Sequence, residues 1–150
     1  MRPSLLTLLA ALLGSFFISS PSFAKTVKYE LTVTREPVNL SGKKTIDFAL
    51  TVNGGIPAPT LEFTEGDDAE ILVKNNIPGN EEVSIHWHGI LLPPEEDGVA
   101  YVNTPPIHAG TSRLFKFKIR KNGTYWYHSH TAVQEQKGVY GAFIIHPKKK

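Results

Sequence analysis

The most informative residues in this sequence are two pairs of histidines. The first pair is His86 and His88, the second is His128 and His130, and one residue separates the members of each pair. On a β-strand, residues i and i+2 point to the same face and lie roughly 6.5–7 Å apart. Each pair would therefore present two imidazoles side by side, and pairs on neighbouring strands would bring four ring nitrogens to one place.

All-imidazole sites suit copper or zinc, and the Irving–Williams order favours copper(II). A single pair of this spacing is more often solvated or hydrogen-bonded than bound to metal. Two pairs among only six histidines favour metal binding. The remaining two histidines have ordinary settings, since His108 lies in a proline-rich loop and His146 stands beside Pro147 near the C-terminus. We expect neither of them to bind the metal.

The segments that carry the pairs are typical of strands. Residues 83–88 contain the first pair, and residues 124–128 lead into the second. Trp87 lies between two candidate ligands and must point to the opposite face, into the core. Tyr125 and Tyr127 are expected to fill the core as well.

The rest of the chain also alternates apolar and polar residues with the period of half-buried strands. We expect a loop at 93–106, a helical turn at 131–137 at most, and no longer helix. Many short strands separated by regular turns indicate an all-β fold, an antiparallel β-sandwich or barrel. The further expected strands are 26–34, 45–52, 60–63, 69–73, 114–119 and 139–145.

Length and composition limit the other possibilities. The chain has 150 residues, of which 41% are hydrophobic and 20% charged, which is typical of one globular domain. Its net charge of +2 is spread along the sequence and gives no sign of nucleic-acid binding. It has no cysteine, which excludes disulfides, cysteine nucleophiles and any copper–thiolate centre within these residues.

The first 24 residues are expected to be a secretory signal peptide. Arg2 precedes an apolar run at 5–18, and the run 22–24 supplies the small residues that a signal peptidase recognises, so cleavage is predicted after Ala24. The alternative, an uncleaved membrane anchor, would need about 20 apolar residues. We therefore expect no stable membrane anchor, a periplasmic or secreted protein, and a single domain at 25–150.

Several motifs together resemble one known family, the multicopper oxidases, and within it the copper-resistance and laccase-like branch. The two histidine motifs are similar to the family's N-terminal copper motifs, Ser-Ile-His-Trp-His-Gly at 84–89 and Gly-Thr-Tyr-Trp-Tyr-His-Ser-His at 123–130. The opening segment 52–60, the Asp-Gly-Val at 97–99 and the ending at 138–145 are similar too. The resemblance covers residues 25–147, almost the whole expected mature chain.

The resemblance implies a cupredoxin fold, which is a plastocyanin-like Greek-key β-sandwich. It also implies that His86 binds the type 2 copper of a trinuclear cluster, while His88, His128 and His130 bind the paired type 3 coppers. Asp97 matches an acid that supplies protons to the cluster. The same carboxylate would alternatively orient a ligand imidazole, or only form the turn before Gly98.

The sequence also departs from the family pattern. The family's last domain carries the cysteine of the type 1 copper and four further cluster histidines, and neither is found here. The sequence therefore predicts half of a trinuclear site that needs a companion cupredoxin domain, or self-association through the histidine face, for oxidase activity. A stand-alone copper-binding or copper-buffering protein is the alternative, and a gene fragment without independent function is a third possibility.

Overall fold

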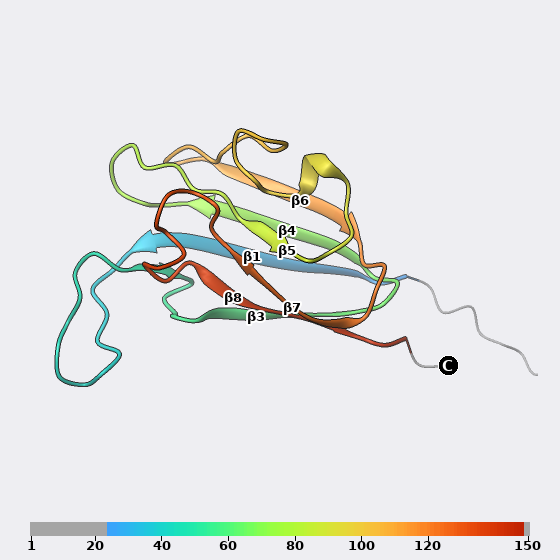
Figure 1. Ribbon diagram of the computed structural model, residues 1–150, viewed down its shortest axis with the longest axis horizontal. Coiled ribbons are helices and arrows are strands. Elements are labelled where there is room, and N and C mark those ends of the chain that lie inside the picture. The colour runs from blue at the N-terminus through green and yellow to red at the C-terminus, as the bar shows by residue number, and fades with distance from the viewer. Residues whose placement is uncertain (1–23, 149–150) are drawn as a thin grey trace, which may run out of the picture.

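Two four-stranded sheets pack face to face in the computed structural model, which describes residues 24–148 (Figure 1). The order in one sheet is β2-β1-β4-β6, and in the other it is β3-β8-β7-β5. The strands are β1 (Thr26–Arg35), β2 (Leu50–Val52), β3 (Ala58–Thr64), β4 (Asp68–Asn75), β5 (His86–His88), β6 (Ser112–Lys118), β7 (Gly123–His128) and β8 (Tyr140–His146). One 3-10 turn, η1 (Pro94–Glu96), lies in the loop between β5 and β6. The all-β prediction is confirmed.

The prediction of a purely antiparallel arrangement was wrong. β1 pairs with β4 in parallel, and β3 pairs with β8 in parallel, while the other ladders are antiparallel. The reason is that consecutive strands change sheets. β3 and β4 are joined by a tight turn but belong to different sheets, so each finds a partner that is distant in sequence.

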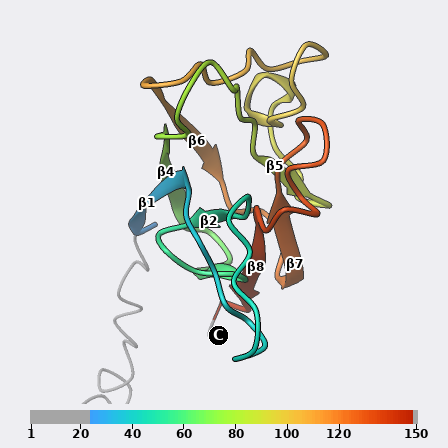
Figure 2. The same cartoon turned by 90° about the vertical axis from the view of Figure 1, so that its left-hand side faces the viewer.

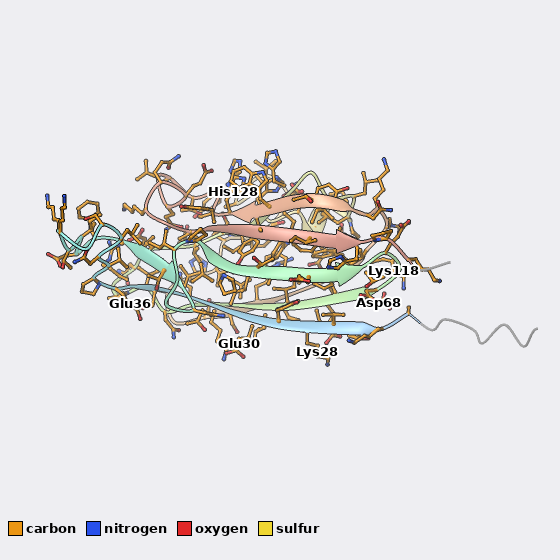
Figure 3. The ribbon with its side chains drawn as sticks, turned by 90° about the horizontal axis from the view of Figure 1, so that it is seen from below. Lys28, Glu30, Glu36, Asp68, Lys118 and His128 are labelled. Atoms are coloured by element: carbon orange, nitrogen blue, oxygen red, sulfur yellow. The ribbon has the colours of Figure 1, made fainter. Side chains whose placement is uncertain are left out.

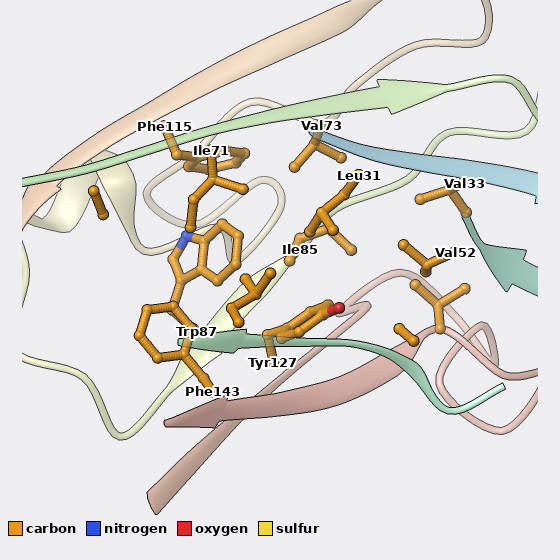
Figure 4. Packing of buried hydrophobic residues seen from close by; sticks show 14 of the residues in the cluster. Leu31, Val33, Val52, Ile71, Val73, Ile85, Trp87, Phe115, Tyr127 and Phe143 are labelled. Atoms are coloured by element: carbon orange, nitrogen blue, oxygen red, sulfur yellow. The ribbon is translucent and has the colours of Figure 1, made fainter. Parts of the chain in front are cut away.

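The alternating residues bury one face of each strand as expected. The inner faces meet in one core in which the Trp87 ring contacts Phe115, Tyr127 and Phe143, with ring centroids 5.3, 5.9 and 6.1 Å away (Figure 4). Trp87 and Tyr127 are fully buried, as predicted, whereas Tyr125 is only partly buried against the edge of the core. Trp87 thus anchors a strand of three residues to both sheets.

Two predicted strands are shorter than expected. Strand β2 covers only the end of the predicted strand 45–52, and Phe48, an apolar residue in the alternating pattern of that segment, is 64% exposed. Residues 45–48 lie in a loop held by one bridge between Val38 and Ile46, so their alternation has no sheet to face. The segment 83–88 is regular strand only at His86–His88.

The expected helical turn at 131–137 is a series of turns, with hydrogen bonds from the Gln134 amide to the Thr131 carbonyl and from the Lys137 amide to the Val133 carbonyl. Within residues 24–148, no helix is long and apolar enough to cross a membrane. The predicted signal peptide at 1–24 lies outside the described residues except for Ala24.

A single glycine lets the β5–β6 loop approach the first histidine pair. Gly98 has a φ of +83°, and a Cβ on it would lie 1.7 Å from the Ile85 carbonyl oxygen. Its amide also donates to the Thr104 hydroxyl at 2.8 Å. No other residue can take this backbone conformation so close to another backbone.

We expect Gly98→Ala to lower the free energy of unfolding by more than about 2 kcal/mol, because left-handed strain and a backbone clash add together. Gly110→Ala is the matched control, since Gly110 has a φ of +73° and open space around it. That variant should cost only about 1 kcal/mol in urea unfolding. Equal losses for the two variants would contradict the close approach at Gly98.

Candidate metal centre

The two histidine pairs meet because β5 and β7 are neighbouring antiparallel strands. His86 lies opposite His128, Trp87 opposite Tyr127, and His88 opposite Trp126. The period of two places Trp87 and Tyr127 on the core face and the imidazoles on the outer face. The ladder thereby converts two motifs 40 residues apart into one cluster.

Ring nitrogens of three histidines gather closely in this cluster. One ligand atom each from His86, His88 and His128 lie within 4.8 Å of one another. His88 Nδ1 and His128 Nε2 are 3.3 Å apart. The His130 ring is not in this tight group, but its centroid lies 5.7 Å from that of His86 and 5.9 Å from that of His128.

Backbone carbonyls orient two of these rings. His86 Nδ1 donates to the Asp97 carbonyl oxygen at 2.8 Å, and His128 Nδ1 donates to the Ser129 carbonyl oxygen at 3.0 Å. Each bond occupies Nδ1 and leaves Nε2 without a proton, and the Nε2 of His128 faces His88 Nδ1 at 3.3 Å. Both rings are therefore oriented with the lone pair on Nε2, the form in which an imidazole binds a metal.

A carboxylate supports each of the same two rings. Asp97 Oδ1 lies 3.4 Å from His86 Nδ1, and the other oxygen of Asp97 accepts a hydrogen bond from Asn103 at 2.9 Å. On the second pair, Glu135 Oε2 lies 2.9 Å from His128 Nδ1. The carbonyl of Asp97, rather than its carboxylate, is the nearer acceptor for His86.

The environment of His128 favours the neutral ring. Burial, together with the neighbouring His86 and His88 rings, lowers the pKa of His128 despite the opposing effects of the Ser129 carbonyl and the Glu135 carboxylate. The ring is therefore neutral at pH 7, which is the form that binds a metal. Trp126 stacks on this ring with a centroid distance of 4.1 Å and an interplanar angle of 17°.

The other two histidines lie apart from the cluster. His108 Nδ1 pairs with Glu82 at 2.8 Å, and His146 Nε2 pairs with Glu62 at 3.0 Å. Both rings are largely exposed, and neither belongs to the group of gathered ligand atoms.

Sequence reasoning missed the residues that support the second pair. Glu135, Gln134 and Ser84 all contact the His128–His130 segment or its neighbours. The only available signal was the expected helical turn at 131–137, and the turns found there bring Glu135 back to His128. The stacking of Trp126 was signalled only by the aromatic run that precedes the pair.

The chemistry of these ring nitrogens decides whether the cluster can hold a copper or zinc ion. The donor set is entirely imidazole, is partly shielded by Trp126, and has its outward nitrogens free of protein partners other than one another. Neutral imidazole is a preferred ligand of both metals. The residues present therefore fit such an ion.

Comparisons with known proteins agree with this chemistry. The sequence pattern of the family described as "Multicopper oxidase" matches residues 32–150. Copper resistance protein A of Escherichia coli is 47% identical over 118 residues, which are 79% of this chain and 19% of that protein. Its counterpart from Pseudomonas syringae pv. tomato is 43% identical over 122 residues, 81% of this chain and 19% of that protein. The chain thus spans about a fifth of these relatives.

Solved structures give the same relationship. The crystal structure of a multi-copper oxidase from Pseudomonas thermotolerans superposes with a TM-score of 0.78 at 32% identity, covering 85% of this chain and 31% of that one.

We predict that Asp97→Ala leaves the metal-free His86 ring protonated on Nδ1, because the backbone carbonyl of residue 97 remains the main acceptor. Nitrogen-15 NMR of the imidazoles measures the tautomer directly. A switch of His86 to the Nε2 tautomer in this variant would show that the carboxylate, not the carbonyl, orients the ring.

Proposed function

The chain belongs to the multicopper oxidase family, whose cofactor is copper, and on that premise we propose that it is the family's N-terminal copper-binding domain. In this proposal it supplies half of a trinuclear copper site that reduces dioxygen. His86 is assigned to the type 2 copper. His88, His128 and His130 are assigned to the type 3 pair.

The observation that supports this assignment best is the group of three ring nitrogens within 4.8 Å of one another. Copper held there would supply one-electron redox chemistry for oxygen reduction. The chain's own residues bind and orient: the Asp97 and Ser129 carbonyls fix two rings, and Trp126 shields one of them from water. The carboxylate of Asp97, 3.4 Å from His86 Nδ1 and only partly exposed, is proposed to supply protons to the site, as the family resemblance implies.

The second half of the site is proposed to come from a companion cupredoxin domain, in the same polypeptide or in another chain. The face bearing the pairs is open, since His88 and His130 are both exposed. Leu91 and Val133, each three residues beyond a histidine pair, are exposed apolar side chains. Exposed apolar side chains in the segments that follow the histidine pairs favour association with another surface.

The opposite side of the molecule is unsuited to such contact. The outer face of β1, β4 and β6 carries alternating charges, with Glu70 accepting from Lys28 at 2.9 Å and from Lys116 at 3.0 Å. Figure 3 shows Lys28 and Glu30 on the side of the molecule away from His128. A companion domain is therefore expected on the histidine face.

A stand-alone copper-binding or copper-buffering protein is the second candidate function. The specific observation in its favour is that the three gathered ring nitrogens all belong to this chain. For either function we propose export through the signal peptide at 1–24, giving a periplasmic or secreted domain that begins at Lys25.

We expect the chain from Lys25 onward to bind copper(II) through the two pairs. A variant with both His86→Ala and His128→Ala should lose at least about 100-fold in affinity, since one ligand is removed from each strand. Isothermal titration in a buffer that does not chelate copper measures this loss.

The matched control carries His108→Ala and His146→Ala, which also removes two of the six histidines. It should bind copper as the unmodified chain does, because both rings pair with glutamates away from the cluster. Equal affinity of the two double variants would contradict the assignment of the site.

We further expect the copper-loaded chain to be nearly colourless and inactive as an oxidase by itself. The intense blue band of a type 1 centre needs a cysteine thiolate, and these 150 residues contain none. Visible spectroscopy and oxygen uptake with a phenolic substrate test this. Steady oxygen consumption above that of free copper, abolished by His128→Ala, would contradict the need for a companion domain.

A further inference from the structure

The strand ladder that aligns the histidines does not reach all of them. Pairing between β5 and β7 covers three residue pairs and ends at His86 opposite His128. Ser129 and His130 lie beyond it, where β7 has ended. The position of His130 relative to the first pair must therefore depend on other contacts.

One such contact is the side chain of Gln134, which is 1% exposed. Its Oε1 accepts a hydrogen bond from the Ser129 hydroxyl at 2.7 Å. Its Nε2 donates to the Glu82 carbonyl oxygen at 2.7 Å and to Glu81 Oε1 at 3.0 Å. Gln134 thus joins the segment after the second pair to the segment that enters β5.

A second set of hydrogen bonds joins the same two segments through Ser84. The Ser84 hydroxyl oxygen accepts from the His130 amide at 3.1 Å and lies 3.0 Å from the Thr131 hydroxyl. The Ser129 hydroxyl oxygen in turn accepts from the Thr131 amide at 3.1 Å. Figure 2 shows the turn between β7 and β8 lying beside β5, where these bonds form.

The far end of this network is also fixed. Glu81 forms an ion pair with Arg35 at the end of β1, in the other sheet. A movement of the turn at 131–137 would have to break buried hydrogen bonds, and a buried polar group without a partner is costly. The network therefore favours one placement of the turn relative to β5.

We propose that Gln134, with Ser84 as its parallel partner, is a positioning residue that holds His130 in register with the first histidine pair. This role rests on the proposed copper site, because its purpose is to place the fourth imidazole beside the other three. Gln134 itself touches no metal: it acts through Ser129 and the backbone of Glu82. Hydrogen bonds that orient ligands commonly change metal affinity 10–100-fold when they are removed.

The main variant is Gln134→Met, which keeps the length of the side chain and removes its three hydrogen bonds. We expect copper(II) affinity to fall about 10–100-fold and the copper(II) electron paramagnetic resonance spectrum to change, while the β-sheet circular dichroism stays the same. The matched control is Thr51→Val. Thr51 is a buried residue of β2, and this variant removes the hydrogen bond that its hydroxyl donates to Glu36. It should leave the affinity and the spectrum unchanged.

A rescue experiment separates hydrogen bonding from packing. Gln134→Glu places a carboxylate against Glu81 and removes both donated hydrogen bonds, so it should impair binding as much as Gln134→Met. Adding Glu81→Gln restores a donor facing residue 134 and removes the repulsion between the two carboxylates. Partial recovery of affinity in the double variant is expected, and no recovery would overturn the proposal in favour of a packing role.

A measurement without metal tests the positioning directly. Hydrogen exchange of the His130 and Thr131 amides should be about 10-fold faster or more in Gln134→Met, because both amides donate to groups in this network. The Tyr127 amide, within the ladder, should be unaffected. Unchanged exchange at His130 and Thr131 would overturn the positioning role, whereas failure of the unmodified chain to bind copper would overturn only the proposed function.

Discussion

The pairing of β5 with β7 is the constraint on which the rest of this structure depends. It places His86 opposite His128 and His88 opposite Trp126, with these three imidazoles on one face and Trp87 and Tyr127 on the other. A slip of one residue would turn the histidines of one strand into the core and bring an aromatic residue to the surface. The register of β5 with β7 therefore determines how the three gathered imidazoles lie relative to one another.

A strand of three residues cannot hold that register by hydrogen bonds alone. Burial of Trp87 between the sheets supplies the missing stability, since deleting such a side chain costs about 3–5 kcal/mol. The β5–β6 loop adds a second restraint, because the absence of a Cβ at Gly98 lets the Asp97 carbonyl reach His86. Core packing below and a backbone acceptor above hold the first pair from both sides.

The residues that could be predicted from sequence are those whose roles follow from local period. Alternation identified the faces of most strands and the burial of Trp87, and the histidine spacing identified the cluster. Alternation does not report which strands pair, so the parallel ladders of β1 with β4 and β3 with β8 were missed. Phe48 fits the alternation of apolar and polar residues but is exposed, because its segment is a loop and not a strand of a sheet. Glu135 and Gln134 escaped notice because their partners lie on other segments.

The two faces of the sandwich solve opposite problems. On the β1–β4–β6 face, lysines and carboxylates neutralise one another within the chain, which leaves little reason for another surface to bind. On the histidine face, ring nitrogens of three histidines lie within 4.8 Å of one another, where they can bind a metal ion. Gln134 accepts a hydrogen bond from the Ser129 hydroxyl and Ser84 accepts one from the His130 amide, and these bonds restrain the segment that carries the second pair. Rigidity of this kind lowers the entropy lost when a metal binds, and under the proposed function it would equally favour completion of the site by a companion domain.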